Sequence, residues 1–512
     1  MTRFIITLLL CLLGQLNLVA TVQLPDILTD NMVLQREQPV PIWGTAAVGE
    51  KVVVTFGKQQ KETTADEQGN WKVFLAPLKV SFQPTTLKIN EHELKNILVG
   101  EVWLCSGQSN MQWTVAQSGN GQDAISKANY PNIRLFNVSR EVAFKRKEGK
   151  LATWQACSPQ SVADFSGVGY FLGQDLFQKL QVPIGLINAS YGGSQVEAWT
   201  PRPYLQTSAD FLPCIEREKI WAAERAQVKI DFKKAIQDWE KADKVAKEKE
   251  EKSPKKPRVP DALRDYRIAG SIYENLIAPL IPFGIKGVTW YQGESNEERA
   301  EQYRLLLPTM IQSWRDKWQQ EALPFCLVQL PNFRPINNAP EDIAWSHLRE
   351  SQRRVAEQTE KVDMVVTIDL GEVDNGHPSN KKDVGLRLAK WAISTVYRGN
   401  EIWSGPMYKK AKIKKGKVVL FFDQIGKGLQ ISQGSELKEF TIAGKDKQWH
   451  WAKAKIKGKK KIVVWSDKVK APLAVRYAFN QNPSLQNLTN HSGLPASPFR
   501  TDDWPGPTAG KR

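Results

Sequence analysis

Five short apolar segments between residues 97 and 400 limit what this chain can fold into more than any other feature of its sequence. Stretches with helical character separate them, and several are apolar on both faces. Parallel strands covered by helices on both sides have this pattern. The segments are Glu101–Cys105, Ile184–Asn188, Gly287–Tyr291, Phe325–Leu330 and Met364–Asp369. The sequence therefore predicts an α/β domain with a parallel sheet over residues 97–400.

Polar and glycine-rich residues follow the ends of four of these segments. In open α/β sheets, ligands bind in the crevice outside the carboxyl ends of the strands. This rule places Ser109, Gly192-Gly193, the Gln292–Glu294 segment and the Asp374–His377 segment on one rim of the predicted sheet. We expect the functional site at this rim.

Both ends of the chain have β character. Residues 22–96 alternate with period two around a turn at Asp66–Gly69, which predicts a small β-sandwich. Residues 402–512 predict a second β domain. The expected strands are Val52–Phe56 and Trp71–Leu75 in the first domain, and Lys417–Phe422, Lys461–Trp465 and Ala474–Ala478 in the second.

A helical insertion over residues 215–260 interrupts the α/β domain. Apolar residues recur at helical spacing between Ile215 and Val245, and a charged, proline-rich segment follows over Lys247–Pro260. We expect the helix to pack on the body of the domain, and the alternatives are a lid or a contact between subunits.

The first 20 residues have the pattern of a signal peptide. Arg3 precedes the apolar run Phe4–Leu13, and Ala20 offers a small residue for cleavage. The run is too short to span a bilayer, and no later segment is apolar enough to do so. We therefore expect a secreted or periplasmic protein. That compartment permits, without requiring, a disulfide between Cys157 and Cys214.

The formal net charge is +17, and lysines are spread through the chain with local runs at Lys409–Lys417 and Lys453–Lys461. No nucleic-acid-binding motif accompanies these runs, so we expect no nucleic-acid partner. A solvated lysine-rich surface is the favoured interpretation. Attraction to an acidic glycan is the functional alternative.

Ser109 is the strongest candidate nucleophile. An apolar strand runs into Gly107-Gln108-Ser109-Asn110, where the glycine lets the chain turn and present the hydroxyl. A serine hydroxyl needs a general base. Of five histidines, only His347 and His377 belong to the α/β domain. His377 follows Asp374 by three residues on a predicted loop, so the carboxylate can orient the imidazole as in a serine hydrolase triad.

Three sequence blocks resemble the SGNH (GDSL-like) hydrolase superfamily, and more closely the sialate O-acetylesterase family. They are Gly-Gln-Ser-Asn-Met at 107–111, Trp-Tyr-Gln-Gly-Glu-Ser-Asn at 290–296 and Asp-Asn-Gly-His-Pro at 374–378. The chain lacks the G-x-S-x-G motif of α/β-hydrolases. Segments at 31–35, 42–44 and 493–500 extend the resemblance over nearly all of the mature chain.

The resemblance implies a flavodoxin-like, three-layer SGNH domain flanked by N- and C-terminal β domains. It implies Ser109 as nucleophile, His377 as general base and Asp374 as the orienting acid, with no metal and no cofactor. An oxyanion hole of the Ser109 amide, a glycine amide and an asparagine side chain is usual in the superfamily. We assign the glycine amide to Gly193.

The third oxyanion donor and Glu294 stay open because this sequence departs from the family's Gly-x-Asn block. It has Gln292-Gly-Glu-Ser-Asn296 instead. We favour Gln292, which directly follows the strand, with Asn296 as the alternative. Glu294 could be catalytic, could replace Asp374, or could be a buried acid paired with Arg349; we favour the last.

The expected function is hydrolysis of O-acetyl esters on a sugar or glycan, and the resemblance points to sialate. An acetylxylan or other polysaccharide acetylesterase is an alternative, because fold does not fix substrate. Two further alternatives are a non-catalytic carbohydrate-binding protein and a polyanion-binding surface protein. Nothing in the sequence indicates the oligomeric state.

Overall fold

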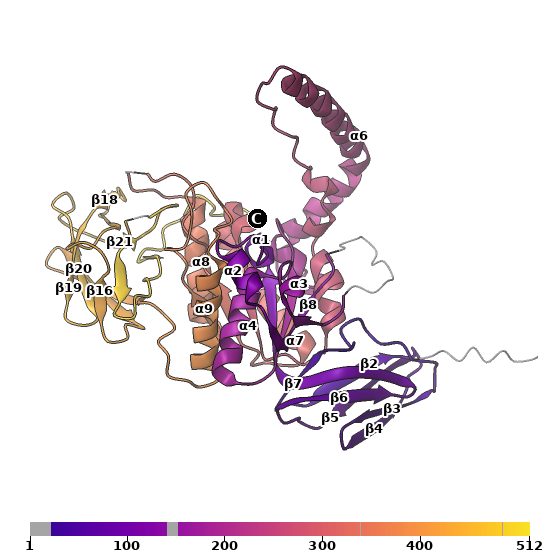
Figure 1. Cartoon of the computed structure of the whole chain (residues 1–512). Coiled ribbons are helices and arrows are strands. Elements are labelled where there is room, and N and C mark those ends of the chain that lie inside the picture. The colour runs from indigo at the N-terminus through magenta and orange to yellow at the C-terminus, as the bar shows by residue number, and fades with distance from the viewer. Residues whose placement is uncertain (1–21, 141–151, 338, 484) are drawn as a thin grey trace, which may run out of the picture.

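The centre of the protein is a mixed α/β unit around a mainly parallel sheet (Figure 1). The computed structural model describes residues 22–140, 152–337, 339–483 and 485–512. The strand order is β13-β12-β11-β7-β10-β8-β9, and all neighbours are parallel except β8 and β9. The strands are β7 (His92–Gly107), β8 (Tyr130–Asn137), β9 (Gln155–Cys157), β10 (Ile184–Ser190), β11 (Gly287–Tyr291), β12 (Phe325–Val328) and β13 (Val362–Val365). The five expected strands are confirmed, although β13 begins and ends earlier than expected, and β8 was not expected.

Helices cover both faces of this sheet. Alternate residues of β7 enter two separate apolar cores: Val102 and Leu104 in one, Trp103 and Cys105 in the other. The first core includes residues of α7 (Ala300–Trp318) and α8 (Ala344–Gln358), and the second includes residues of α4 (Gly167–Leu180) and α9 (Lys381–Trp391). This two-sided burial explains why the strands are apolar on both faces. Short helices complete the unit: α1 (Ser109–Gln112), α2 (Gly121–Ser126), α3 (Pro159–Val162) and α5 (Arg202–Leu205).

Strand β7 belongs to two sheets at once. Its first half pairs with β1 and β6 of the N-terminal β region, and its second half pairs with β10 and β11 in the central sheet. The expected domain boundary between residues 96 and 97 thus falls inside one continuous strand. The N-terminal strands are β1 (Val33–Gln35), β2 (Val40–Thr45), β3 (Lys51–Phe56), β4 (Gln59–Thr64), β5 (Asn70–Leu75) and β6 (Ser81–Ile89).

The C-terminal region forms small antiparallel sheets. A four-stranded sheet has the order β14-β15-β20-β19, a second has the order β18-β17-β21-β23, and β16 pairs with β22. The strands are β14 (Met407–Lys414), β15 (Lys417–Asp423), β16 (Leu429–Ile431), β17 (Phe440–Ala443), β18 (His450–Trp451), β19 (Lys453–Lys457), β20 (Lys461–Trp465), β21 (Ala474–Tyr477), β22 (Leu488–Asn490) and β23 (Phe499–Arg500).

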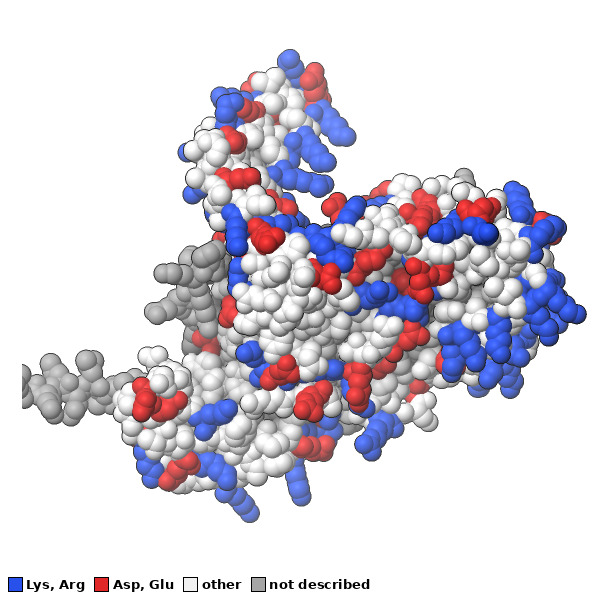
Figure 2. All heavy atoms as spheres, turned by 180° about the vertical axis from the view of Figure 1, so that it is seen from behind, with Lys and Arg blue, Asp and Glu red and all other residues white. Residues whose placement is uncertain are grey.

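The insertion is a long helix, α6 (Leu212–Glu248), that projects from the body as an arm (Figures 1 and 2). The expectation that it packs on the body was wrong. Trp239 of its apolar face contacts the segment that returns to the domain: its indole donates to the Pro254 carbonyl at 2.8 Å, and Lys256 lies over the same ring. The sequence pattern of α6 shows that one face of the helix is apolar, but it does not show which part of the chain covers that face.

Cys105, Cys157, Cys214 and Cys326 are buried free thiols, so the permitted Cys157–Cys214 disulfide is absent. The expected signal peptide at residues 1–20 lies outside the described residues. No helix in the described part of the chain is long and apolar enough to cross a membrane.

Candidate active site

Ser109 lies at the carboxyl edge of the central sheet, where β7 ends and α1 begins. The turn requires glycine at position 107: its φ is +134°, and a β-carbon there would lie 2.2 Å from the Tyr291 carbonyl oxygen. Ser109 itself is partly exposed, and its hydroxyl makes no hydrogen bond to another described residue. The hydroxyl is therefore available for chemistry.

Two contacts hold the His377 loop against the Ser109 helix. The Trp113 indole stacks on the His377 ring, with centroids 4.6 Å apart and planes at 10°. The Asn110 side-chain amide donates to the Gly376 carbonyl at 3.0 Å. Because Asn110 follows Ser109 and Gly376 precedes His377, these contacts bring the predicted nucleophile and base to the same edge of the sheet.

The environment of His377 favours its neutral form. The ring is half-buried, and desolvation together with the nearby positive charge of Lys381 lowers its pKa below the ordinary value of 6.5. A neutral imidazole can accept a proton, as a general base must.

A buried polar network lies behind Ser109. The Lys381 ammonium donates to the Asn110 side-chain oxygen at 2.6 Å, and the Asn110 amide donates to Glu294 Oε1, also at 2.6 Å. Burial lowers the pKa of Lys381 to about 7 and raises the pKa of Glu294. Asn110 stands next to the nucleophile in the sequence, but nothing in the sequence singled out Lys381.

The expected ion pair between Glu294 and Arg349 is not formed. Glu294 contacts Asn110 instead, and the Arg349 guanidinium donates to the Asn480 carbonyl. Arg349 lies on α8 and holds the C-terminal region, whereas Glu294 lies at the candidate site.

Asp374 is exposed, and its carboxylate makes no hydrogen bond or ion pair to another described residue. Glu372 fixes the shape of this loop, because its carboxylate accepts hydrogen bonds from the amide and hydroxyl of Ser379, both at 2.7 Å, and from Asn375 at 2.7 Å. The Asn375 side chain in turn accepts from the His377 amide at 2.9 Å. No group of three potential metal ligands gathers within the described ranges.

Two backbone amides beside the nucleophile are unpaired. Neither the Ser109 nor the Gly193 N–H donates to another described residue. Gly193 has a φ of +73°, and a β-carbon on the neighbouring Gly192 would lie 3.4 Å from Ser109 Cβ. The Gly192 amide donates to Gln112 Oε1 at 2.7 Å, which leaves the Gln112 amide group beside the nucleophile. Gln112 was not singled out from the sequence.

The two predicted side-chain donors point into the protein. Gln292 Nε2 donates to the Ser194 carbonyl at 3.2 Å and to Asn296 Oδ1 at 2.8 Å. Asn296 Nδ2 donates to the buried carboxylate of Glu197 at 3.0 Å, and its oxygen accepts from the Val196 amide. Both side chains therefore connect residues 194–197 to residues 292–296 in this conformation.

Comparison with known proteins identifies the family. Residues 99–229 and 261–394, just over half of the chain, match the family model described as "Carbohydrate esterase, sialic acid-specific acetylesterase". The chain belongs to this family. This confirms the resemblance to sialate O-acetylesterases and identifies the protein as an esterase. The unmatched residues 230–260 are the outer part of the α6 arm and its returning segment.

Relatives of the esterase match along most of its length. The sialate O-acetylesterases of Mus musculus and Homo sapiens are each 28% identical to it, covering 91% and 94% of this chain and 92% and 93% of theirs. The crystal structure of a carbohydrate acetylesterase from Xanthomonas citri is 33% identical, has a TM-score of 0.79, and covers 94% of this chain and 100% of its own.

The esterase has a hollow of about 820 Å³ beside its candidate site. Glu294 and Ser295 line it, together with Arg217 at the base of α6 and with Arg264 and Arg267 of the returning segment, residues 249–270. Three further carboxylates also line it: Asp261, Glu297 and Glu298. Pockets of this size hold small ligands. The returning segment also supplies Tyr266, whose ring packs 4.8 Å from that of Tyr191, next to Gly193.

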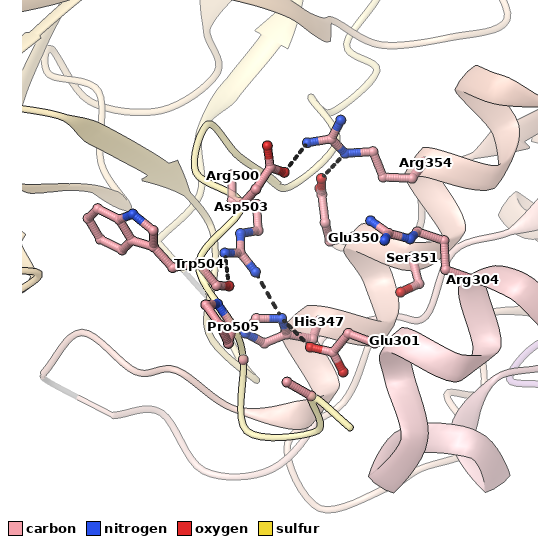
Figure 3. Close-up of a pocket in the computed structure, with 12 residues that line it drawn as sticks. Glu301, Arg304, His347, Glu350, Ser351, Arg354, Arg500, Asp503, Trp504 and Pro505 are labelled. Atoms are coloured by element: carbon pink, nitrogen blue, oxygen red, sulfur yellow. Dashed lines mark hydrogen bonds and ion pairs between the residues drawn. The ribbon is translucent and has the colours of Figure 1, made fainter. Parts of the chain in front are cut away.

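His347 occupies a different pocket of the esterase (Figure 3). Its Nε2 lies 2.5 Å from Asp342, and its Nδ1 lies 3.1 Å from the Arg500 guanidinium. None of the residues lining this pocket is a predicted catalytic or oxyanion residue. His347 therefore links α8 to the C-terminal segment.

Proposed function

We propose that the esterase hydrolyses O-acetyl esters of sugars with Ser109, His377 and Asp374 as its triad, on a domain of the SGNH type. One observation carries the assignment: the Trp113–His377 stack and the Asn110–Gly376 hydrogen bond hold the base loop against the nucleophile helix. In this conformation the imidazole bonds neither the Ser109 hydroxyl nor the Asp374 carboxylate, and the proposal requires both bonds to form when substrate binds.

The proposed reaction has two acyl-transfer steps. His377 takes the hydroxyl proton while Ser109 Oγ attacks the acetyl carbonyl. The backbone amides of Ser109 and Gly193 donate hydrogen bonds to the resulting oxyanion. The bond to the sugar oxygen breaks, and His377 gives that oxygen its proton. Water then attacks the acetyl-serine with His377 again as base, acetate leaves, and Ser109 regains its proton.

The test is replacement of the nucleophile with a matched control. Ser109→Ala is expected to abolish acetate release from 4-nitrophenyl acetate while the protein stays folded. Ser106→Ala removes a serine of β7 that lies three residues before Ser109 and whose buried hydroxyl donates to the Ala189 carbonyl at 2.7 Å. That variant should keep its turnover. Normal activity in folded Ser109→Ala would refute the proposal.

Asp374 is proposed as the orienting acid because its carboxylate is uncommitted and lies three residues before the base. Glu294 is the rival, since it is buried near the same loop. Asp374→Asn should lower kcat by about 10³-fold or more through the wrong imidazole tautomer. A comparable loss in Glu294→Gln alone would assign the role to Glu294.

A side-chain amide is proposed to complete the oxyanion hole, with Gln292 favoured and Asn296 as the alternative. Either one must release a present partner to do so. Removing a true donor lowers kcat by about 10²–10³-fold. Measuring kcat in Gln292→Ala, Asn296→Ala and Gln112→Ala identifies which side-chain amide stabilises the oxyanion.

The proposed substrate is an O-acetylated sialate. The relatives carry this substrate in their names, and the arginines of the neighbouring hollow, which now pair with Glu197 and Asp261, would pair with the carboxylate of the sugar instead. Acetate release from O-acetylated sialic acid, acetylated xylan and other acetylated glycans distinguishes the substrates. Equal rates on sialate and neutral glycans would contradict the role of the arginines.

Residues 1–20 are proposed as a signal peptide that directs the enzyme to the periplasm or the medium. The support is the apolar run Phe4–Leu13 with Arg3 before it. The N-terminal sequence of the mature protein, isolated from each cell fraction, tests this.

A further inference from the structure

The positive charge of the esterase is concentrated in its C-terminal β region. Residues 402–512 contain 22 lysines and arginines against 7 aspartates and glutamates, a net +15, which leaves +2 of the chain's +17 for all other residues. Lysines and arginines occur throughout the chain, but only in this region do they clearly outnumber the carboxylates. Figure 2 shows these side chains gathered on the C-terminal domain, at the right of that view.

Eight of the lysines cover one face of the sheet β14-β15-β20-β19. The opposite face is apolar, because Val418, Leu420, Ile462 and Val464 are buried in the core. The residues that alternate with these buried ones point to the other face, and the strand register pairs them with one another across the sheet. We call this surface the lysine face: Lys410, Lys412, Lys414, Lys417, Lys453, Lys455, Lys457 and Lys461.

The charges on the lysine face are largely uncompensated. Within the described residues, only Lys453 of the eight forms an ion pair with a carboxylate, Asp467 at 2.9 Å. Lys417 lies over the Trp465 ring and Lys461 over the Phe421 ring. Alternate residues of a strand are about 6.6 Å apart, so each edge strand presents a row of evenly spaced cations.

A groove of about 1010 Å³ opens beside this face, along β19. Trp449, Trp451 and Trp465 line it, together with Lys453 and Lys455 of the lysine face. Trp451 is 42% exposed although it is a large aromatic residue. Trp449 is covered by Arg476 and Trp465 by Lys417, so Trp451 offers the exposed apolar ring surface on which the C–H face of a sugar can stack.

We propose that the C-terminal β domain is a binding site for an acidic polysaccharide, which lies across the lysine face and in the tryptophan groove. Carboxylates along the polymer meet the lysine rows, and individual sugar rings stack in the groove. This binding does not depend on the proposed triad. Its benefit, a higher local concentration of acetylated polymer, rests on the proposed function.

A polysaccharide is favoured over a nucleic acid by two observations. The enzyme is a carbohydrate esterase, so its reaction requires contact with glycans. The lysine face contains eight lysines and no arginine, whereas the planar guanidinium of arginine is the group best matched to phosphate. Because a row of lysines also attracts nucleic acid, the experiment must measure the binding of duplex DNA as well.

The experiment is affinity electrophoresis of the full-length protein through gels that contain polygalacturonate. The triple variant Lys412→Glu/Lys455→Glu/Lys457→Glu is compared with Lys229→Glu/Lys233→Glu/Lys241→Glu, which changes the same charge on the exposed α6 arm. Wild type should be retarded, less so as salt rises. The first variant should bind about tenfold more weakly or worse, and the arm variant like wild type.

Turnover of 4-nitrophenyl acetate should be equal in all three proteins, which separates polymer binding from the esterase reaction and shows that each protein is folded. Trp451→Ala leaves the charge unchanged and should weaken binding several-fold. The proposal is overturned if wild type is not retarded, if both triple variants weaken binding equally, or if duplex DNA at the same charge concentration is bound as tightly. Unchanged binding by Trp451→Ala would overturn the role of the groove.

Discussion

Asn110 is the residue whose replacement tests the site most directly. Its side chain makes three hydrogen bonds, two of them at 2.6 Å with the charged groups of Lys381 and Glu294 and one with the Gly376 carbonyl. In Asn110→Ala these bonds are lost, and two buried charged groups lose a partner. Each hydrogen bond to a charged group contributes about 1.5–3 kcal/mol.

The expected loss of stability is smaller than the sum of these bonds, because Lys381 and Glu294 carry opposite charges and can move toward each other. We expect about 3 kcal/mol, which lowers the melting temperature of the catalytic domain by about 6–12 °C. The His377 loop also loses one of its two contacts with this part of the chain, and only the Trp113–His377 stack is left. A displacement of about 1 Å in a reacting group costs roughly 10²-fold in rate, so kcat/KM should fall by that order.

The assay is hydrolysis of 4-nitrophenyl acetate at a temperature well below the transition, with the melting curve recorded on the same samples. Asn129→Ala is the matched control, because Asn129 is exposed and its side chain makes no hydrogen bond with another described residue. Its activity and melting temperature should match wild type. A destabilised Asn110→Ala with full kcat/KM would refute the conclusion that this amide positions the base loop.

Four further outcomes follow from the structure. Because burial and Lys381 lower the pKa of His377, kcat/KM should reach half its maximum below pH 6.5, and an apparent pKa above 6.5 would contradict this. Lys381→Gln removes the charge but keeps a donor for Asn110, so it should move that midpoint upward; an unchanged pH profile would count against the electrostatic effect. The pKa of Lys381 is about 7 in the folded protein and about 10.5 in the unfolded chain, so the unfolded chain binds more protons between these pH values. The free energy of unfolding should therefore rise with pH over this range, and Lys381→Gln should flatten the rise in denaturant titrations. His347→Ala should lower the melting temperature and leave kcat unchanged; a large loss of kcat in the folded variant would show that the wrong histidine was assigned.

The place of Ser109, directly after the end of a buried strand, could be predicted from the sequence because its signals are local. An apolar strand, a glycine and a serine stand within a few residues, and the positive φ of Gly107 and the nearby Tyr291 carbonyl show why glycine is necessary there. The parallel sheet could also be predicted from the sequence, because strands that are buried on both faces are apolar throughout. His377 followed from counting the histidines within one domain.

The network behind the nucleophile could not be predicted, because its members are distant in sequence. Asn110 and Lys381 are 271 residues apart, and no periodicity indicates that α9 places its first residue beside α1. Gln292 stands where the motif suggests a donor, but its direction depends on contacts with Ser194 and Asn296 that only the folded loop defines.

The shared strand β7 has a consequence for the way this enzyme can be divided. A cut between residues 96 and 97 severs one strand in the middle, so the N-terminal β region is not an exchangeable module. Its removal would strip β1 and β6 from the strand that ends at the nucleophile, and would leave unpaired backbone N–H and C=O groups on buried residues such as Leu98 and Val99. The N-terminal region thus supports strand β7 through backbone hydrogen bonds. An enzyme shortened in this way would need new hydrogen-bonding partners for β7 before it could fold.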